Sequence, residues 1–313
     1  MAEDRPLEAL TVSAPATSAN LGPGFDCLAV ALDLGNAVVI TRRPGPLEVR
    51  VTGEGEGEVP EDASNLVCQA LEMGLDSLDG LAIECRNRIP LGRGLGSSAA
   101  AVCSGLVAAN ALGRLRWTPD DLLARATAIE GHADNAAACI LGGLVAVGPG
   151  PTGRLIALPE ELTFVAVIPE ARTSTDDARR AMPAEVPLAD VAATLANAVG
   201  LTLALCESRL DDLPALLEDR VHEPHRAPRI PGVEVVRGLV DGGDCVGATI
   251  SGSGPAMLLW CRQDGAARVA AAAEAALATA GIAARVRPSR PSAAGVRARW
   301  TGGSDLRLAR AVG

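Results

Sequence analysis

The residues best suited to chemistry form the run GRGLGSS at positions 92–98. Three glycines in five positions leave the backbone without Cβ atoms, so it can turn sharply and approach a ligand closely. The apolar segment 101–112 follows and predicts a buried helix. Free N–H groups and the positive end of the dipole at the start of such a helix favour an anion, most naturally phosphate. The hydroxyls of Ser97 and Ser98 would add a donor to that phosphate and an oxygen ligand for magnesium.

This run differs from two widespread phosphate-binding patterns. No lysine follows the glycines, so it is not a GxxxxGK[ST] loop. The chain contains no lysine at all, since its 28 basic residues are all arginine, which also excludes Schiff-base chemistry and an ATP lysine of the protein-kinase type. Ser97 stands where a dinucleotide fingerprint has its last glycine. The remaining alternative is a turn that only starts a helix, and the third glycine with the two serines favours a phosphate site over it.

A second polar cluster, EGHADN at positions 130–135, separates a predicted helix from an alanine-rich apolar segment. Thr118 supplies the N-cap signal for that helix. A single histidine or aspartate at such a place would most often cap a helix. His132, Asp134 and Asn135 lie so close together that we interpret the cluster as part of a functional site.

Two further polar groups are ambiguous from the sequence alone. Asn20 and Asp26 lie in a segment rich in Pro, Gly and Ser, residues 15–26, which we predict to be a loop; there such residues more often shape turns than bind ligands. The HEPH sequence at 222–225 suggests a metal site by its spacing. Pro224 disrupts the helical facing of the two histidines and no third ligand is near, so we expect a loop without a metal.

The composition describes an acidic globular protein without nucleic-acid or membrane partners. Of 313 residues, 48% are hydrophobic, 2% are aromatic and none is tyrosine, so stacking of bases on aromatic side chains is not expected. The net charge of −10 argues against nucleic acid or an anionic membrane, and the positive potential for a phosphate must be local. Neither a leader peptide nor an apolar run of 18 residues is evident, so we expect a cytoplasmic protein.

The length predicts two domains, and strand-like patterns that alternate with helical ones predict an α+β fold. We place the boundary before the apolar run at 164–168, which gives domains 1–160 and 161–313, with a loosely held tail from about residue 288. Eight cysteines without a C-x-x-C pair lie mostly in apolar runs. This is typical of buried thiols in a reducing compartment and not of disulfides or zinc ligands.

Four segments together carry a family resemblance. The run PLGRGLGSSAA at 90–100 resembles the ATP-binding loop of the GHMP kinases. The segments APATSANLGPGFD at 14–26, EGHADNAAACILGGL at 130–144 and GATISGSGPAMLLW at 247–260 resemble those of the homoserine kinases within that family. The resemblance implies the two-domain α+β GHMP kinase fold. An N-terminal ribosomal-protein-like β-α-β domain would carry the ATP loop, and the C-terminal domain would be a ferredoxin-like α/β sandwich.

The resemblance also implies roles toward ATP and magnesium. Ser98 and Glu130 would hold a magnesium ion, and Thr175 would lie near the γ-phosphate. Asn65 and Arg88 would lie on the adenosine side. The loop that would bind ATP comprises Pro90, Leu91, Gly92, Arg93, Gly94, Leu95, Gly96, Ser97, Ser98, Ala99 and Ala100.

By the same resemblance, the acceptor would be L-homoserine. Asp26 would pair with its ammonium group, Arg226 would pair with its carboxylate, and Asn20 would help to hold the amino acid. The residues lining the pocket near the attacking hydroxyl would be His132, Asn135 and Arg179. The groups with catalytic roles would be Asn135, Arg179, Glu130 and Ser98.

The implied reaction transfers the γ-phosphoryl group of ATP to the side-chain hydroxyl, giving O-phospho-L-homoserine for threonine biosynthesis. It would proceed by direct attack without a dedicated base. One alternative is a GHMP kinase for another small alcohol such as mevalonate, which the absence of Asp26 or Arg226 would have favoured. Another is a GHMP-fold binding protein without turnover, which would show changes at Ser98, Glu130 or Arg179. The resemblance further implies a homodimer.

Overall fold

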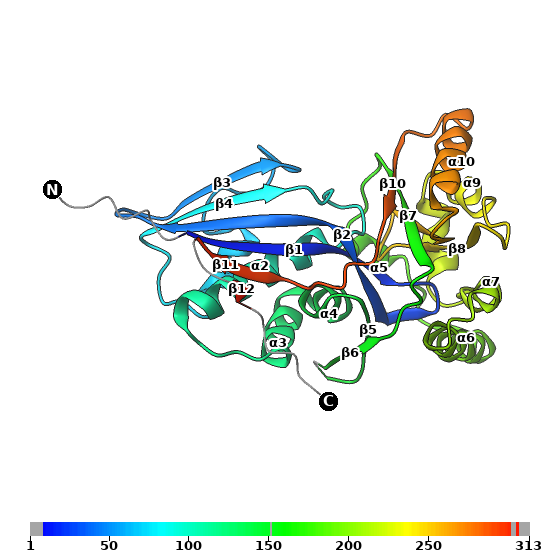
Figure 1. The fold of residues 1–313 in the computed structure, drawn as a ribbon, viewed down its shortest axis with the longest axis horizontal. Coiled ribbons are helices and arrows are strands. Elements are labelled where there is room, and N and C mark those ends of the chain that lie inside the picture. Colours follow the sequence, from blue (N-terminus) through cyan, green and yellow to red (C-terminus); the bar gives the residue numbers. More distant parts are fainter. Residues whose placement is uncertain (1–8, 151, 302–304, 307–313) are drawn as a thin grey trace.

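The computed structural model describes residues 9–150, 152–301 and 305–306, and it contains two β-sheets that follow one another along the long axis of the molecule (Figure 1). Residues 1–8, where the sequence analysis finds no leader, lie outside the described part of the chain. An eight-stranded sheet with its helices forms one half, and a four-stranded sheet with its own helices forms the other.

The first sheet is built around a long hairpin of β1 (Ala9–Asn20) and β2 (Gly24–Arg42). Its strand order is β12-β11-β1-β2-β4-β3, and β5 pairs with residues 28–30 of β2 and with β6. Alternate side chains of β1, such as Leu10 and Val12, are buried in the core. The remaining strands are β3 (Glu48–Gly53), β4 (Leu81–Asn87), β5 (Leu144–Val147), β6 (Gly153–Ile156), β11 (Arg297–Trp300) and β12 (Asp305–Leu306).

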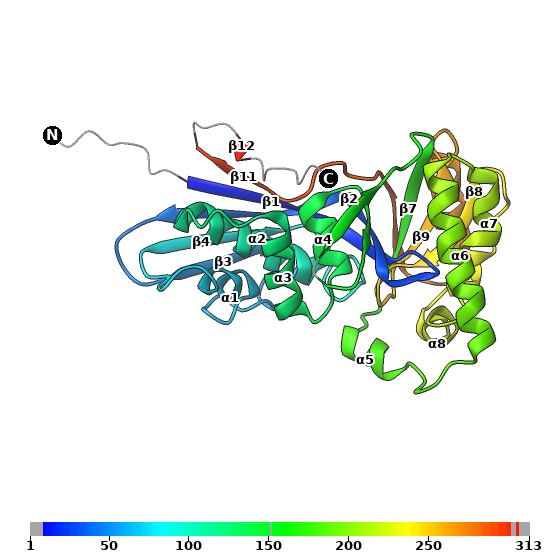
Figure 2. The same ribbon diagram turned by 90° about the horizontal axis from the view of Figure 1, so that it is seen from below.

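Four helices gather on one side of these strands (Figure 2). A Cβ at Gly105 would collide with the carbonyl oxygen of Val67, so glycine permits the close crossing of two of them. The sequence-based prediction of a cap at Thr118 is confirmed: its Oγ1 accepts a hydrogen bond from the N–H of Asp121 at 3.2 Å, and Asp121 accepts one in return at 2.9 Å. The helices are α1 (Leu66–Glu72), α2 (Ser97–Gly113), α3 (Pro119–Glu130) and α4 (Asp134–Leu141).

The second sheet has the order β10-β7-β9-β8 and is antiparallel throughout. Both of its faces are buried: Phe164 and Trp260 belong to the same core as the first sheet, while Val165 and Leu259 belong to a separate core. Strands covered on both faces read as continuous apolar runs, which is the pattern at 164–168. The strands are β7 (Leu162–Pro169), β8 (Cys245–Ile250), β9 (Met257–Arg262) and β10 (Ala284–Ser289).

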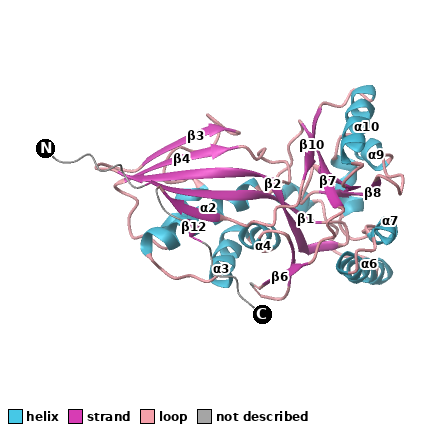
Figure 3. Ribbon diagram, viewed as in Figure 1, coloured by secondary structure: helices cyan, strands magenta, loops and turns pink. Residues whose placement is uncertain are grey.

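Two pairs of helices of this half, α6 with α7 and α9 with α10, lie on opposite faces of its sheet (Figure 3). Buried residues of α6 and α7 share the core of the first sheet, and those of α9 and α10 form the separate core. The helices are α5 (Thr175–Arg180), α6 (Leu188–Cys206), α7 (Leu213–Leu216), α8 (Glu223–Arg226), α9 (Val233–Arg237) and α10 (Ala266–Thr279), with 3₁₀ turns at Leu210–Asp212 and Ala227–Arg229.

Helix α6 exposes an apolar face that the sequence analysis did not anticipate. By length and composition alone, its 19 residues could cross a membrane, and only 22% of its apolar stretch is buried. The exposed fractions are 82% for Leu188, 62% for Leu195, 62% for Val199 and 50% for Leu203. Most of the large hydrophobic side chains exposed in the described part of the chain therefore lie on this one helix.

The structure corrects two local predictions. Residues 15–20, predicted as part of the loop 15–26, continue β1 because they pair with β2, and Pro15 is accommodated at a shift of register. Residues 24–26 already belong to β2, so only 21–23 form a turn. The segment at 222–226, also predicted as a loop, contains the short helix α8. Pro224 lies in its first turn, where a missing N–H costs no helical hydrogen bond.

The prediction of a loosely held tail from residue 288 is also wrong for residues 288–301. After β10 the chain returns to the first sheet, where Gly143 N–H donates to Ser292 O at 2.7 Å and Val296 N–H donates to Cys139 O at 2.7 Å. Strand β11 then pairs with β1. The order comes from distant partners, which the local composition does not reveal. The boundary at 160/161 falls between β6 and β7 and stays a prediction, but the segment 290–301 packs with the first sheet.

Replacement Val296→Ala tests this docking of the C-terminal segment. The side chain is 4% exposed, so removing two buried methyl groups should lower the free energy of unfolding by about 1–3 kcal/mol. Arg297→Ala is the matched control, because Arg297 is adjacent and exposed and should change that free energy by less than about 0.5 kcal/mol. Urea unfolding followed by circular dichroism measures both, and equal effects would contradict the docked segment.

Candidate active site

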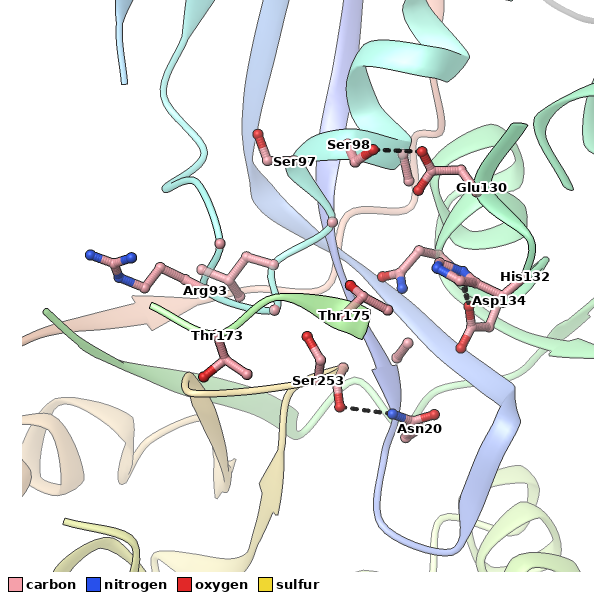
Figure 4. Close-up of a pocket in the computed structure, with 18 of the residues that line it drawn as sticks. Asn20, Arg93, Ser97, Ser98, Glu130, His132, Asp134, Thr173, Thr175 and Ser253 are labelled. Atoms are coloured by element: carbon pink, nitrogen blue, oxygen red, sulfur yellow. Dashed lines mark hydrogen bonds and ion pairs between the residues drawn. The ribbon is translucent and has the colours of Figure 1, made fainter. Parts of the chain in front are cut away.

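A cavity of about 190 Å³ lies where the loop before α2, the β1–β2 turn, the start of α4, the segment leading into α5, and the β8–β9 turn meet (Figure 4). Most residues singled out from the sequence line it, although they come from widely separated stretches of the chain. These residues are Asn20, Asp26, Pro90, Gly92, Arg93, Gly94, Leu95, Gly96, Ser97, Ser98, Ala99, Glu130, His132, Asn135, Thr175, Arg179 and Arg226.

The glycine loop, residues 90–96, lies too close to its neighbours to carry side chains at two positions. Gly94 has a φ of 75°, and a Cβ there would collide with the carbonyl oxygen of Ser251. Gly96 has a φ of 68°, and a Cβ there would collide with the hydroxyl of Thr17. Gly96 is also the N-cap of α2, and no side chain caps the helix there. The first turn of α2 lines the cavity, so an anion can satisfy its N–H groups.

Hydrogen bonds from both halves of the molecule hold the glycine loop. The N–H of Thr17 donates to the carbonyl of Leu95 at 3.1 Å, and the N–H of Thr173 donates to that of Gly92 at 3.1 Å. The hydroxyl of Ser251 donates to the carbonyl of Gly94 at 2.7 Å. The Arg93 guanidinium donates in turn to the carbonyls of Leu91, Pro169 and Glu170. The loop therefore presents its backbone to the cavity, while its arginine side chain connects the two halves.

Ser98 and Glu130 bring two oxygen ligands together at the start of α2. The Ser98 hydroxyl donates to Glu130 Oε1 at 2.5 Å (Figure 4). Among the described residues, no group of three or more His, Cys, Asp or Glu side chains could hold a metal ion. Magnesium needs no such group, because it commonly takes one or two protein oxygens and completes its shell with phosphate oxygens and water. The pair therefore suits a metal that arrives with a nucleotide.

The cluster at 130–135 is organised around the buried carboxylate of Asp134. Its Oδ1 accepts a hydrogen bond from the N–H of Asn135 at 2.7 Å and lies 3.2 Å from Nδ1 of His132. The hydrogen bond to Asp134 raises the pKa of His132, although burial opposes the shift. Asn135 Oδ1 accepts from the Thr17 hydroxyl at 2.7 Å, so its amide NH₂ is the end that can donate to a ligand.

Asn20 shapes the turn that carries Asp26. Its Oδ1 accepts from the N–H of Asp26 at 3.0 Å, and its Nδ2 donates to the carbonyl of Gly252 at 2.8 Å. Both residues have positive φ angles, 71° and 54°, which Asn and Asp adopt more readily than most side-chain-bearing residues. The amide of Asn20 thus positions Asp26 within the cavity wall.

Asp26 forms an ion pair with Arg179 of α5. Nη2 and Nη1 of the guanidinium lie 3.0 and 3.2 Å from the two carboxylate oxygens, and both side chains are about 40% exposed. The contact joins the first sheet to the segment that follows β7. An exposed pair of this kind contributes only about 0–1 kcal/mol, so a charged ligand can replace either partner.

Arg226 of α8 is 5% exposed and lines the cavity. Nη1 donates to the carbonyl of Gly252 at 2.9 Å, and the guanidinium lies 5.1 Å from the ring centre of Phe25. Nε is buried and has no hydrogen-bond partner among the described residues. Burial lowers the pKa of this arginine, which nevertheless remains charged. A buried guanidinium with an unsatisfied donor is suited to bind a carboxylate.

A second cavity of about 430 Å³ adjoins the first at Gly92, Ser97 and Ser98. Two more of the residues expected at the nucleotide line it, namely Asn65 and Leu91. Asn65 caps α1 by accepting a hydrogen bond from the N–H of Val67 at 2.9 Å, so it shapes the wall of this cavity. The apolar part of the lining includes Val59, Pro60, Leu66, Val67, Leu91 and Ala101, which suits a purine base.

Two residues expected at ATP lie outside both cavities. Ala100 is buried inside α2, behind the residues that line the cavity. Arg88 lines a separate cleft together with Arg285. Successive side chains at the end of β4 point to opposite faces of the sheet, which explains the placement of Arg88. Asn87 lines the second cavity, so Arg88, the next residue, lies on the opposite face.

Several groups of the site were not assigned a contact from the sequence. Thr17 and Gly252 lie in segments that carry the family resemblance, but the contacts of the Thr17 hydroxyl with Asn135 and of the Gly252 carbonyl with Asn20 depend on the fold. Thr173 and Ser174 also line the cavity, and their position beside Thr175 could have indicated it. Asp134, which the sequence analysis placed in a functional cluster without a role, holds His132 and Asn135.

Comparison with known proteins gives a consistent result. The family description "GHMP kinases N terminal domain" matches residues 63–143, and "GHMP kinases C terminal" matches residues 201–279. A homoserine kinase of Mycobacterium sp. (strain KMS) is 43% identical over 264 residues, which cover 79% of this chain and 83% of the relative. The homoserine kinase of Streptomyces coelicolor is 42% identical over 279 residues, covering 85% and 88%. The crystal structure of homoserine kinase from Cytophaga hutchinsonii has a TM-score of 0.85 at 30% identity, covering 93% of this chain and 97% of that one.

Replacement Asp134→Asn tests the contact between His132 and Asp134. Asparagine keeps the shape but loses the charge that favours the imidazolium ion, so the pKa of His132 should fall. The raised pKa belongs to the folded state. Histidine has a pKa of about 6.5 in the unfolded chain, and below that pH the contact contributes its full stabilisation. The stabilisation is lost as the pH rises through the higher pKa that His132 has in the folded protein. NMR titration of the His132 ring measures the shift, and an unchanged or higher pKa in the variant would exclude Asp134 as its cause.

Proposed function

The chain belongs to the homoserine kinase family within the GHMP kinases, and we propose that the two adjoining cavities form its active site. The family activity is the ATP-dependent phosphorylation of L-homoserine to O-phospho-L-homoserine, a step of threonine biosynthesis. In the proposal, ATP lies along the glycine loop with its base in the apolar cavity. Homoserine lies in the smaller cavity between Asp26 and Arg226.

The observation that carries the proposal is the buried guanidinium of Arg226, whose Nε has no hydrogen-bond partner within the described part of the chain. Homoserine carries a carboxylate and an ammonium group on one carbon, with the hydroxyl two carbons away. The carboxylate would accept from Nε and from the neighbouring nitrogen of the planar fork. The ammonium group would take the place of Arg179 at Asp26, which frees the Arg179 guanidinium for the phosphoryl group. The hydroxyl would then reach Asn135 and the glycine loop.

The phosphates of ATP fit the start of α2, where backbone N–H groups and the helix dipole favour negative charge. We place magnesium at Ser98 and Glu130, whose oxygens lie beside this anion site. A bound magnesium ion would neutralise charge on the β- and γ-phosphates. Thr175 lines the same cavity, at the end of the segment that crosses the glycine loop, and would lie near the γ-phosphate.

We further propose that the hydroxyl attacks the γ-phosphorus directly, without a dedicated base. Each carboxylate of the cavity has another partner: Asp26 pairs with Arg179, Glu130 accepts from Ser98, and Asp134 holds His132 and Asn135. Alignment by Asn135 and Arg179 and stabilisation of the developing charge then supply the catalysis. A general base contributes about 10²–10⁴ in rate, so a loss of that size in kcat for Asp134→Asn would contradict this step.

The pocket chemistry favours homoserine over the alternatives. Mevalonate carries a carboxylate and no ammonium group, so it offers no cation to take the place of Arg179 at Asp26, and Arg179 would stay paired there instead of reaching the phosphoryl group. A binding protein without turnover would have no need for groups toward the γ-phosphate. Ser98, Glu130 and Arg179 all line the cavity, which supports turnover.

We also infer a homodimer that uses α6, and a cytoplasmic location. No Asp, Glu, Lys, Arg or His occurs from Val191 to Cys206, so two antiparallel copies of α6 could pack together without placing like charges in their contact, although each chain has a net charge of −10. The described cysteines are all free thiols, which supports a reducing compartment.

Sedimentation equilibrium tests the dimer: Leu195→Glu should shift the protein to monomer, and a monomeric wild type would exclude the contact.

Replacement Arg226→Gln tests the assignment of the carboxylate. The loss of two charge-assisted hydrogen bonds should lower kcat/KM for homoserine by about 10²–10³, and KM for ATP should change less than about twofold. Release of ADP with magnesium-ATP is measured against L-homoserine, L-serine, L-threonine and mevalonate. Arg229→Gln is the matched control, because Arg229 is three residues away and exposed. Turnover of mevalonate but not of homoserine would contradict the amino-acid pocket.

Replacement Glu130→Gln tests the assignment of magnesium. It removes a charged oxygen ligand, so the magnesium concentration for half-maximal activity at saturating ATP should rise by about tenfold. KM for homoserine should stay within about twofold of the wild-type value. An unchanged magnesium dependence would remove Glu130 from the metal site.

A further inference from the structure

We propose that His222 is a positioning residue for recognition of the amino acid. Its imidazole accepts a hydrogen bond from Arg226 and donates one to the turn that carries Asp26, and it thereby fixes the guanidinium relative to that turn. The inference rests on the proposed function in one respect, the role of Arg226 as the carboxylate ligand. None of the other assignments involves His222, which does not line the cavity.

The surroundings of Nε2 determine the tautomer of His222. Nε2 lies 2.8 Å from the carbonyl oxygen of Gly22 and 3.6 Å from Oδ2 of Asp219. Both neighbours can only accept hydrogen bonds, so Nε2 must carry the hydrogen. The Asp219 carboxylate is itself held by the N–H groups of His222 and Glu223, each at 2.7 Å.

The imidazole is neutral, which leaves Nδ1 with a lone pair. His222 is fully buried, and burial lowers its pKa to about 4 even though Asp219 opposes the shift. Nδ1 lies 3.5 Å from Nη1 of Arg226, which can only donate. The contact is long for a hydrogen bond, but it has one possible direction, from the guanidinium to the imidazole.

This contact selects which edge of Arg226 faces the ligand. Nη1 is held by His222 and by the carbonyl of Gly252, which lies 2.9 Å away. Nε is buried and finds no hydrogen-bond partner among the residues that the structure describes. Nε and Nη2 form the side-on fork that binds a carboxylate with two parallel hydrogen bonds. With Nη1 held, that fork is the edge that remains for the substrate.

Phe25 links the same pair to Asp26. Its ring stacks on the imidazole of His222 with centres 5.0 Å apart, and the Arg226 guanidinium lies 5.1 Å from its centre. Phe25 directly precedes Asp26, and Gly22 lies in the turn between β1 and β2 just before them. His222 and Phe25 therefore hold the carboxylate-binding and ammonium-binding residues in one packed unit. An α-amino acid needs such a fixed relation, because its two charged groups share one carbon.

Two isosteric replacements separate the two hydrogen bonds of the imidazole. The amide oxygen of His222→Asn can occupy the place of Nδ1 and accept from Arg226, but the bond to Gly22 is lost. The amide NH₂ of His222→Gln can occupy the place of Nε2 and donate to Gly22, but the acceptor for Arg226 is lost. We expect KM for homoserine to rise about tenfold or more in His222→Gln, the loss typical of one hydrogen bond to a charged group, and to stay within about threefold in His222→Asn. KM for ATP should be unchanged in both.

The result that overturns the proposal is an equal change of KM for homoserine in both variants, or the larger change in His222→Asn. A purely structural role would lower thermal stability and move both KM values together. If the proposed function is wrong, the wild type itself will not phosphorylate homoserine. If only this inference is wrong, the wild type will be active, and His222→Gln and His222→Asn will not differ in KM for homoserine as expected.

A measurement on the unaltered protein keeps the proposal testable if the variants do not fold. The ¹⁵N chemical shifts of the His222 ring distinguish a bare Nδ1 from a protonated one. The proposal requires a bare Nδ1 and a protonated Nε2 between pH 6 and 8, both with and without homoserine. A protonated Nδ1 would oppose the Arg226 donor and exclude the contact.

Discussion

The structure depends on a close approach of two backbones, those of the glycine loop before α2 and of the turn between β8 and β9. A Cβ at Gly94 would collide with Ser251 O, and the N–H of Ala256 donates to Arg93 O at 3.1 Å. The same turn reaches the β1–β2 hairpin, where the N–H of Gly252 donates to Ala19 O at 3.0 Å. The phosphate loop, the turn that carries Asp26 and the second sheet meet only because no side chain separates them. The contact region between the two halves is therefore also the proposed active site.

The site must concentrate positive potential in a chain whose net charge is −10. It does so with backbone N–H groups and with arginines whose positions are fixed by carbonyl oxygens, such as Arg226 on Gly252 O. Burial of a donor without a partner costs about 1–3 kcal/mol, and Nε of Arg226 carries this cost in the free protein. In the proposed site, the carboxylate of the substrate would remove that cost on binding. The unsatisfied donor of Arg226 would then contribute directly to the specificity for an amino acid.

Much of the local chemistry could be read from the sequence because it depends on neighbours along the chain. The spacing of the glycines and serines at 92–98 and the cap at Thr118 belong to this class, and the structure has both as expected. The tail after Ser289 could not be read, because its order comes from pairing with β1, at the other end of the sequence. Residues 15–20 could not be read, because pairing with the next strand, β2, outweighs a composition that favours a loop. Arg88 was misplaced because a strand alternates its faces, and one residue of register decides the side.

Among the site residues, too, the roles that depend on contacts between distant parts of the chain could not be read from the sequence. His222 was noticed only as half of a metal-like pair, and the contacts with Gly22 and Arg226 that give it a role span about 200 residues and one helical turn respectively. The partnership of Asp26 with Arg179 likewise joins residues 153 positions apart. The family resemblance implied that Asn20, Asp26 and Arg179 contact the substrate, and it implied no role for His222. The fold shows that Asn20 supports another group and that Asp26 and Arg179 hold each other.

The central claim is that Arg226 recognises the carboxylate of an α-amino acid whose hydroxyl is phosphorylated. The most direct test compares L-homoserine with 3-aminopropan-1-ol, which is homoserine without its carboxylate, in the wild type and in Arg226→Gln. In the wild type, removal of the carboxylate should lower kcat/KM by about 10² or more, and in the variant the two substrates should differ by less than about fivefold. The same ratio of the two substrates in both proteins would show that the carboxylate binds elsewhere.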